Sequence, residues 1–358
     1  MPSLKEIKVR INSISSTLAI TSAMKMVAAA KLQKAQMAIQ NMLPYERRLH
    51  SMLIDLMGAM NISAAASEDG SVRGSGSAER GFDQSGDRLS LSNRHDLAGM
   101  DGAYSLMAQR EVRKVAIVAF ASNSSLCGAF NSNAIREATA VINEYRASGL
   151  RDSDIVVYSV GRKMAEAMRK LGFPSPADFT KMSDSPSYEA ASALAQELLD
   201  GFVSGRFDKV ELVYNHYKST SSQPTTRQTY LPLSLADATA DLQAGKIADS
   251  ASESDTNRGA EPVGAPVVRQ GSPTTEDLIV EPSKEALIAT LLPKVIRLRI
   301  FTTLLDSAAA EHAARTVAMQ LATDNGNDLL QELTLEYNKG RQQKITSEIL
   351  DLVGGSMQ

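Results

Sequence analysis

The chain has 358 residues, of which 43% are apolar and only 5% aromatic, with no tryptophan. This composition supplies a buried core but few bulky anchors, which favours long helices over a β-sandwich or a barrel. A net charge of −3 argues against nucleic acid or anionic lipid as a partner, and a single cysteine, Cys127, excludes an internal disulfide.

The first predicted element is a long helix over residues 1–60. Apolar residues recur along it at alternating steps of three and four, and only Thr21, Lys25 and Glu46 interrupt them. A heptad stripe of this length is typical of a coiled-coil helix. At about 1.5 Å per residue, the helix would reach roughly 85 Å.

Two local signals mark this helix. Ser3 and Glu6 have the spacing of a capping box, which places the start of the helix beside them. Pro44 removes one intrahelical hydrogen bond and clashes with the preceding turn, so we expect a kink or a local break there.

Two polar stretches interrupt the regular patterns. Residues 61–108 change abruptly to serine, glycine, aspartate, asparagine and arginine, and residues 237–280 have a similar composition. Neither stretch has enough apolar surface to offset the entropy of ordering. We interpret both as flexible polar insertions.

Between the insertions, residues 109–236 alternate strand-like and helix-like patterns. We expect strands at 115–120, 155–158, 209–217 and 227–233, and helices at 132–147, 162–171 and 188–202. Strands separated by helices of this length predict a small, largely parallel, Rossmann-like α/β domain with helices on both faces of its sheet.

The last predicted element is a second long helix over residues 281–358. Its middle is rich in alanine, which lets another helix approach closely. Two rods of similar length at opposite ends of one chain bury their apolar stripes best against each other, antiparallel if a compact domain joins their far ends. The predicted fold class is therefore α/β with long helices: an antiparallel two-helix coiled coil of the terminal segments, with the α/β domain at one end.

Several stretches of this sequence resemble the ATP synthase gamma family. They are ITSAMKMVAAAKL at 20–32, LCGAFN at 126–131, EHAARTVAM at 311–319 with ATDN at 322–325, ELTLEYNK at 332–339 and RQQKITSEI at 341–349. The resemblance covers the chain apart from the two insertions, in the family's order and spacing. The chain departs from the family at Gly340, where alanine is more usual, and at residues 122–125, where the family more often has a charged, glycine-containing turn.

The resemblance implies a central rotor shaft that couples ion flow to ATP synthesis or hydrolysis. One copy would stand inside a ring of three alpha and three beta subunits, with catalysis on the beta subunits. The α/β domain would bind the epsilon subunit and the ring of c subunits. The chain itself would make and break no bond, so no catalytic residue, cofactor or metal ligand is expected in it.

The same resemblance implies which residues touch the alpha and beta ring. By position they are Met24, Lys25, Arg315, Arg341, Gln342, Thr346 and Glu348. Polar side chains near a slender tip can form and release hydrogen bonds as the rod turns. Lys25 also has a purely structural interpretation, since a charge within an apolar stripe can simply set the register of two helices.

The expected location is peripheral, on the cytoplasmic face of a bacterial inner membrane. The sequence has no run of about 18 apolar residues that could span a bilayer, so contact with the membrane would be indirect. The start of the chain lacks the apolar run of a secretory signal, and we expect a reducing compartment.

Two other classes of function stay open from the residues alone. An α/β domain can belong to a nucleotide-binding enzyme, but the sequence has neither a P-loop motif nor a G-x-G-x-x-G after a strand. A plain tethering coiled coil would need no particular residues at its tip. Cys127 is interpreted as a small buried residue, and the four histidines have no metal-ligand spacing.

Overall fold

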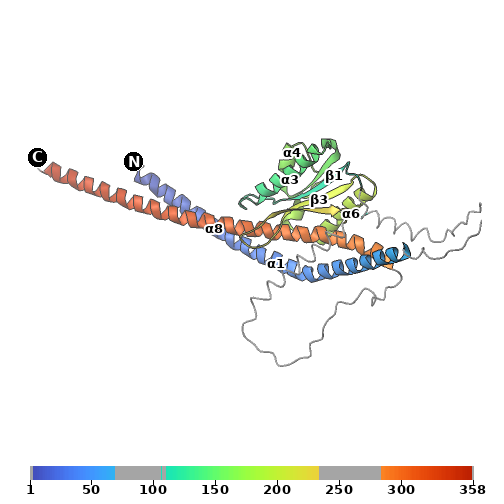
Figure 1. Ribbon diagram of the computed structural model, residues 1–358. Helices are drawn as coiled ribbons and strands as arrows, with labels where there is room; N and C mark the ends of the chain where they lie inside the picture. Colours follow the sequence, from blue (N-terminus) through green and yellow to red (C-terminus); the bar gives the residue numbers. More distant parts are fainter. Residues whose placement is uncertain (1–2, 69–105, 107–109, 234–283, 357–358) are drawn as a thin grey trace, which may run out of the picture.

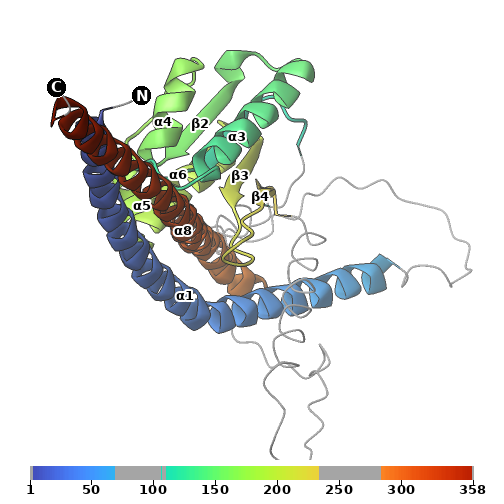
Figure 2. The same cartoon turned by 90° about the vertical axis from the view of Figure 1, so that its left-hand side faces the viewer.

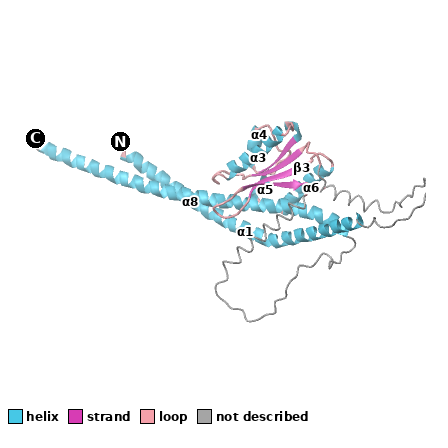
Figure 3. Ribbon diagram, viewed as in Figure 1, coloured by secondary structure: helices cyan, strands magenta, loops and turns pink. Residues whose placement is uncertain are grey.

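The computed structural model describes residues 3–68, 106, 110–233 and 284–356. Two long helices lie side by side and run in opposite directions, so both chain termini are at the same end (Figure 1). A mixed α/β domain packs against the other half of this helix pair, which we call the shaft. In Figure 3 the described strands, in magenta, all lie in the domain, whereas the shaft is drawn as helix. The predicted fold class is confirmed.

Helix α1 spans Leu4–Glu68. The capping box at its start forms, because the Ser3 amide donates to Glu6 Oε2 at 3.0 Å and the Glu6 amide donates to Ser3 Oγ at 3.3 Å. The helix continues past its expected end at residue 60, because residues 61–68 contain neither glycine nor proline and include three alanines in a row.

Of the two expected outcomes at Pro44, a kink or a local break, the break does not occur, since α1 is one helix through this proline. Figure 2 shows α1 strongly bent along its length. Contacts beyond the proline hold the helix together, because Leu49 and Leu53 are buried in the core and Thr302 Oγ1 donates to Glu46 Oε1 at 3.0 Å. The lost backbone hydrogen bond is therefore offset by packing.

Helix α8 spans Lys284–Ser356 and forms the other half of the shaft. The alanine-rich middle fits the heptad stripe of α1, because Leu32 packs against Ala309 and Ala313. Further along, a Cβ atom built at Gly326 would come within 2.6 Å of the Leu18 side chain. Small residues thus bring the helix axes close together, as the sequence predicted.

The sheet has four strands in the order β2-β1-β3-β4. Their bounds are β1 Val115–Phe120, β2 Ile155–Val160, β3 Lys209–Asn215 and β4 Thr225–Leu231. Strand β1 is parallel to both β2 and β3, with Ile117 opposite Val157 and Glu211, whereas β4 is antiparallel to β3. The sheet is largely parallel, as expected, with one antiparallel edge.

Helices cover both faces of the sheet. Helices α3 (Phe130–Ala147) and α4 (Arg162–Lys170) pack on the face to which Ile117 points. Helices α5 (Thr180–Asp184) and α6 (Tyr188–Val203) belong to the opposite face, together with the shaft. All six β1 residues are buried, which explains their continuous apolar run.

One hydrophobic core joins the domain to the shaft. Val118 and Phe120 of β1, Leu198 of α6, Leu53 of α1 and Leu292 of α8 belong to the same buried cluster. The domain therefore lies beside the half of the shaft where α1 ends and α8 begins, and the other half projects from it (Figure 1).

The expected flexible insertions lie largely outside the described residues, which omit 69–105, 107–109 and 234–283. Within the described part of the chain, no helix is long and apolar enough to cross a membrane.

Candidate functional site

In the part of the chain that the structure describes, the projecting end of the shaft consists of α8 alone. Gly340 lies beside Leu4, the first residue of α1, because a Cβ atom built at Gly340 would be 3.1 Å from Leu4 Cδ2. Residues 341–356 therefore extend past the start of α1, as Figure 1 shows. We call these residues the tip. Four of the candidate contact residues lie on it and are exposed: Arg341, Gln342, Thr346 and Glu348.

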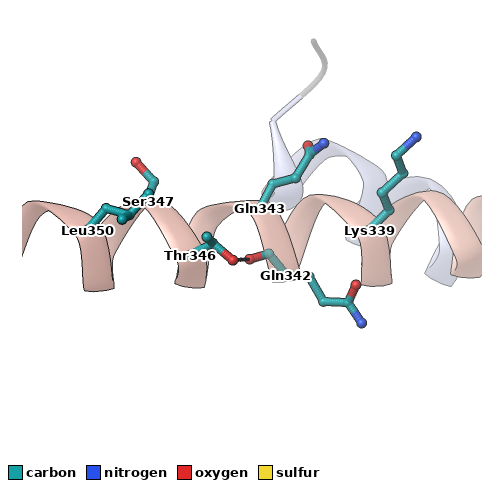
Figure 4. Close-up of a pocket in the computed structure, with 6 residues that line it drawn as sticks. All are labelled: Lys339, Gln342, Gln343, Thr346, Ser347 and Leu350. Atoms are coloured by element: carbon teal, nitrogen blue, oxygen red, sulfur yellow. Dashed lines mark hydrogen bonds between the residues drawn. The ribbon is translucent and has the colours of Figure 1, made fainter.

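A shallow groove lies where the tip begins. Six residues line it: Lys339, Gln342, Gln343, Thr346, Ser347 and Leu350. Figure 4 shows Lys339 and Gln343 pointing to one side of the helix and Gln342 to the other. Thr346 Oγ1 donates to the backbone carbonyl oxygen of Gln342 at 2.9 Å. The side-chain amide of Gln342 takes no part in that bond and is available to a partner.

The charges of the tip make only weak internal contacts. Lys344 Nζ lies 3.7 Å from Glu348 Oε1, and both side chains are exposed. An exposed pair of this kind contributes little to stability because water and salt screen it. Both charges can therefore exchange partners at small cost.

Apolar side chains of the tip are exposed as well. Leu350 is 64% exposed and Leu352 is 75% exposed, and Ile345, Ile349 and Val353 are also open to solvent. The sequence pattern assigns these late apolar positions to the coiled coil. Within the described residues they have no partner helix, because α1 begins beside Gly340. An apolar stripe that continues beyond the start of its partner helix is the signal in the sequence that marks the tip.

Met24 and Lys25 lie at a second level of the shaft. Thr323 Oγ1 donates to Thr21 Oγ1 at 3.2 Å, which places this part of α1 beside residues near 320 of α8. Lys25 is about 32 Å along α1 from Leu4. Met24 is exposed, whereas Lys25 is partly buried within the stripe.

Arg315 differs from the other candidate residues, because its side chain is turned inward and is only 13% exposed. Its Nη2 donates to Glu311 Oε1 at 2.8 Å and to Ser124 Oγ, in the loop after β1, at 2.7 Å. Along α8 it is about 39 Å from Arg341. The structure thus places Arg315 at the junction of shaft and domain, away from the tip.

Burial shifts the titration of two groups beside Arg315. It raises the pKa of Glu311, and the positive charges of Arg315 and Lys31 only partly oppose this. Burial also lowers the pKa of His312 to about 4, with the same two charges acting in the same direction. His312 is therefore neutral at pH 7.

The place where a nucleotide would bind in an α/β domain is filled by the shaft. Ligands of parallel sheets bind beyond the carboxyl ends of the strands. Here the loop after β1 turns through Leu126 and Gly128, which have φ of 68° and 58°. Cys127 and Phe130 of this region pack against Ala310 of α8. Among the described residues, no group of three or more histidine, cysteine, aspartate or glutamate side chains could hold a metal ion.

Comparison with known proteins gives a consistent set of relatives. A family model described as ATP synthase matches residues 3–357. The ATP synthase gamma chain of Phocaeicola vulgatus is 46% identical over 357 residues, which cover 100% of both chains. That of Bacteroides thetaiotaomicron is 44% identical over 358 residues, again covering 100% of both chains.

A solved structure shares the fold. It is a chain in the OSCP, F1 and c-ring part of the mitochondrial ATP synthase of Euglena gracilis, in rotational state 3. The TM-score is 0.52 at 18% sequence identity, and the match covers 99% of this chain and 93% of that one.

Proposed function

The chain belongs to the ATP synthase gamma chain family, and we propose from this membership that it turns as the central shaft of a rotary ATP synthase. The observation that carries the proposal is the projecting helical shaft, whose tip exposes both polar and apolar side chains. In this role, the shaft couples ion flow to ATP synthesis or hydrolysis elsewhere in the complex.

The proposed partners bind at the two ends of the molecule. The tip and the second level at Met24 and Lys25 would stand inside a ring of three alpha and three beta subunits. The opposite end, with the α/β domain, would bind the epsilon subunit and the c-subunit ring. In this proposed arrangement, one copy of the chain would lie peripherally on the cytoplasmic face of the bacterial inner membrane.

The shape of the shaft supports a mechanical role. Helix α1 is bent, so the shaft is not symmetric about its long axis (Figure 2). An asymmetric rod inside a three-fold ring contacts each of the three sites differently, and a turn of the rod drives each site through the same series of states. The free energy that shifts a catalytic site from one state to the next is the difference in contact free energy between two positions of the rod.

The chemistry of the tip suits contacts that must break repeatedly. Exposed Arg341, Gln342 and Glu348 can exchange one hydrogen-bond partner for another, because each bond replaces one to water and contributes about 1 kcal/mol. An apolar inner surface of the ring, which we call the sleeve, could bury Leu350 and Leu352. Apolar burial involves no directional bonds, so the tip can rotate inside the sleeve. Arg315 would instead hold the loop after β1 against the shaft.

We also propose that the chain is not catalytic. The end of β1, where an α/β enzyme would bind its nucleotide, is packed against α8. Catalysis would then take place on the beta subunits, and this chain would contribute only the movement that opens and closes their sites.

The experiment that tests the proposal is reconstitution with alpha and beta subunits. We expect a stable complex whose ATP hydrolysis depends on this chain. Replacement of both Gln342 and Thr346 by alanine should lower turnover, whereas Asp152→Ala, on the domain surface, should not. Nucleotide binding by the chain alone, without any association with alpha and beta, would refute the proposal. Wild-type turnover in the tip variant would favour a plain tether.

A further inference from the structure

The loop between β3 and β4 makes direct contact with the shaft. His216 and Tyr217 follow the last residue of β3, and Pro224 precedes β4. The His216 amide donates to the Pro224 carbonyl oxygen at 2.9 Å, which closes the loop at its base. Asp306 of α8 then holds the loop with both carboxylate oxygens. Oδ1 accepts from the Tyr217 amide at 2.8 Å, and Oδ2 lies 2.6 Å from His216 Nδ1.

Tyr217 extends these contacts to the second helix of the shaft. Its ring packs in a cluster with Leu32 and Ala313, and also in a neighbouring cluster with Phe130. Its hydroxyl oxygen accepts a hydrogen bond from Gln36 Nε2 of α1 at 2.7 Å. One side chain of the domain thus touches both shaft helices.

The loop is firmly attached to the sheet. Asn215, the last residue of β3, is buried and donates from Nδ2 to the Phe130 carbonyl oxygen at 3.1 Å. Its Oδ1 accepts from Thr225 Oγ1, at the start of β4, at 2.7 Å. A buried polar group with both hydrogen bonds satisfied has little freedom to move, so force on the loop passes directly to the sheet.

This contact continues the interface of the core that joins domain and shaft. That core reaches Leu304 of α8, two residues before Asp306, and includes Ile296, whose carbonyl oxygen accepts from the Tyr230 hydroxyl at 2.9 Å. Apolar packing has no preferred direction, whereas the hydrogen bonds to Asp306 hold the loop in one position on the shaft. The loop therefore resists sliding of the domain along α8.

We propose that His216, Tyr217, Asp306 and Gln36 form a clasp that makes the α/β domain and both shaft helices turn as one body. The inference rests on the proposed function, because it concerns how torque passes between the c-ring end and the tip. The clasp residues are positioning residues: they keep the domain aligned with the shaft under load.

The charges around the clasp fit this role. The hydrogen bond to Asp306 raises the pKa of His216, although partial burial and the nearby charge of Lys218 act in the opposite direction. The imidazolium that binds Asp306 most strongly therefore persists to a higher pH than in an isolated histidine.

The test uses the complete ATP synthase in lipid vesicles. The clasp variant carries Asp306→Ala with Tyr217→Phe. The matched control carries Asp152→Ala with Asp154→Ala, which remove two ion pairs within the domain, with Arg146 and Arg151. ATP hydrolysis and ATP-driven membrane potential are recorded together, and the number of ions moved per ATP is compared at increasing opposing potential.

We expect equal assembly and equal ATP hydrolysis in both variants, with a loss of ions moved per ATP in the clasp variant alone. The loss should grow with the opposing potential. Equal values for clasp and control at every potential would overturn the clasp while leaving the proposed function intact. Failure of the wild-type enzyme to pump would overturn both.

A milder variant covers the case in which the double variant does not assemble. Asp306→Asn keeps the shape of the side chain and removes its charge. It should assemble and show a smaller loss of ions moved per ATP, greatest below the pKa of His216. An unchanged ratio at low and high pH would equally overturn the clasp.

Discussion

The exposed apolar side chains of the tip predict a local gain in stability when the shaft enters the ring. Ile349, Leu350 and Leu352 are 54%, 64% and 75% exposed, and no second helix packs beside them within the described residues. In the isolated chain, the last turns of α8 should therefore open easily. Inside an apolar sleeve the same side chains would be buried, and the helix around them would open less often.

The magnitude follows from the exposed fractions. Full burial of a leucine or isoleucine side chain contributes about 2 kcal/mol, and about two thirds of that gain remains to be made at each of the three positions. The sum is about 4 kcal/mol, which lowers the equilibrium constant for opening of the helix about a thousandfold. Residues 284–315 of α8 already lie against the domain and α1, so they should change little.

Hydrogen exchange measured by mass spectrometry checks this prediction. The full chain is compared alone and in complex with alpha and beta subunits. We expect residues 341–356 to become protected on assembly. In Leu350→Asp they should gain less protection, whereas Val203→Asp, at an exposed position on α6, should behave as wild type. A stable complex in which the tip exchanges as fast as in the free chain would show that the sleeve reasoning is wrong.

Three further predictions concern stability. Glu211 is buried in the sheet and bound by Arg227; burial alone would raise the pKa of Glu211, but the hydrogen bonds it accepts outweigh this and lower it. Glu211→Gln should therefore lower the free energy of unfolding by about 3 kcal/mol. This would be seen as a lower urea midpoint for the full chain, and an unchanged midpoint would contradict it. His312 has a pKa of about 4 in the folded chain because it is buried, against an ordinary value of about 6.5. Since the unfolded chain binds the proton more readily, stability should fall as the pH drops from about 6.5 towards 4, and His312→Gln should weaken that fall in urea titrations at several pH values. Gly340→Ala should stabilise the helix beside Leu4 by up to about 1 kcal/mol, because alanine favours helix and the Leu4 methyl can give way; faster exchange of amides around position 340 would refute this.

The sequence predicted the shaft well because its signals are local and repeated. The heptad stripe required a long apolar face, and the alanines around Ala309 and Ala313 provided the surface that such a face can approach. Antiparallel pairing then followed from the position of the α/β domain between the two helices. The central strands were also predictable, since Val115–Phe120 is an unbroken apolar run, which is typical of a strand buried on both faces.

Other features depend on contacts between distant residues and could not be read from the pattern. The continuity of α1 through Pro44 depends on packing beyond it, including the bond from Thr302 to Glu46. The inward turn of Arg315 depends on Ser124, which is 191 positions earlier in the chain. The resemblance to a family suggested a common role for Arg315 and Arg341, but only the fold shows that they lie at different levels of the shaft.

The two ends of the shaft are stabilised in different ways, and this difference fits their proposed tasks. Beside the domain, α8 buries Leu292, Ile296 and Ala309 almost completely, and the clasp adds hydrogen bonds between the domain and the shaft. Beyond Gly340 the helix has neither a partner helix nor a buried face among the residues that the structure describes. Rotation inside a ring requires contacts that form and break. A tip whose side chains were already buried within the shaft could not make such contacts with the ring. Torque at the opposite end requires contacts that do not break, so permanent burial there and exposure at the tip are two parts of one mechanical requirement.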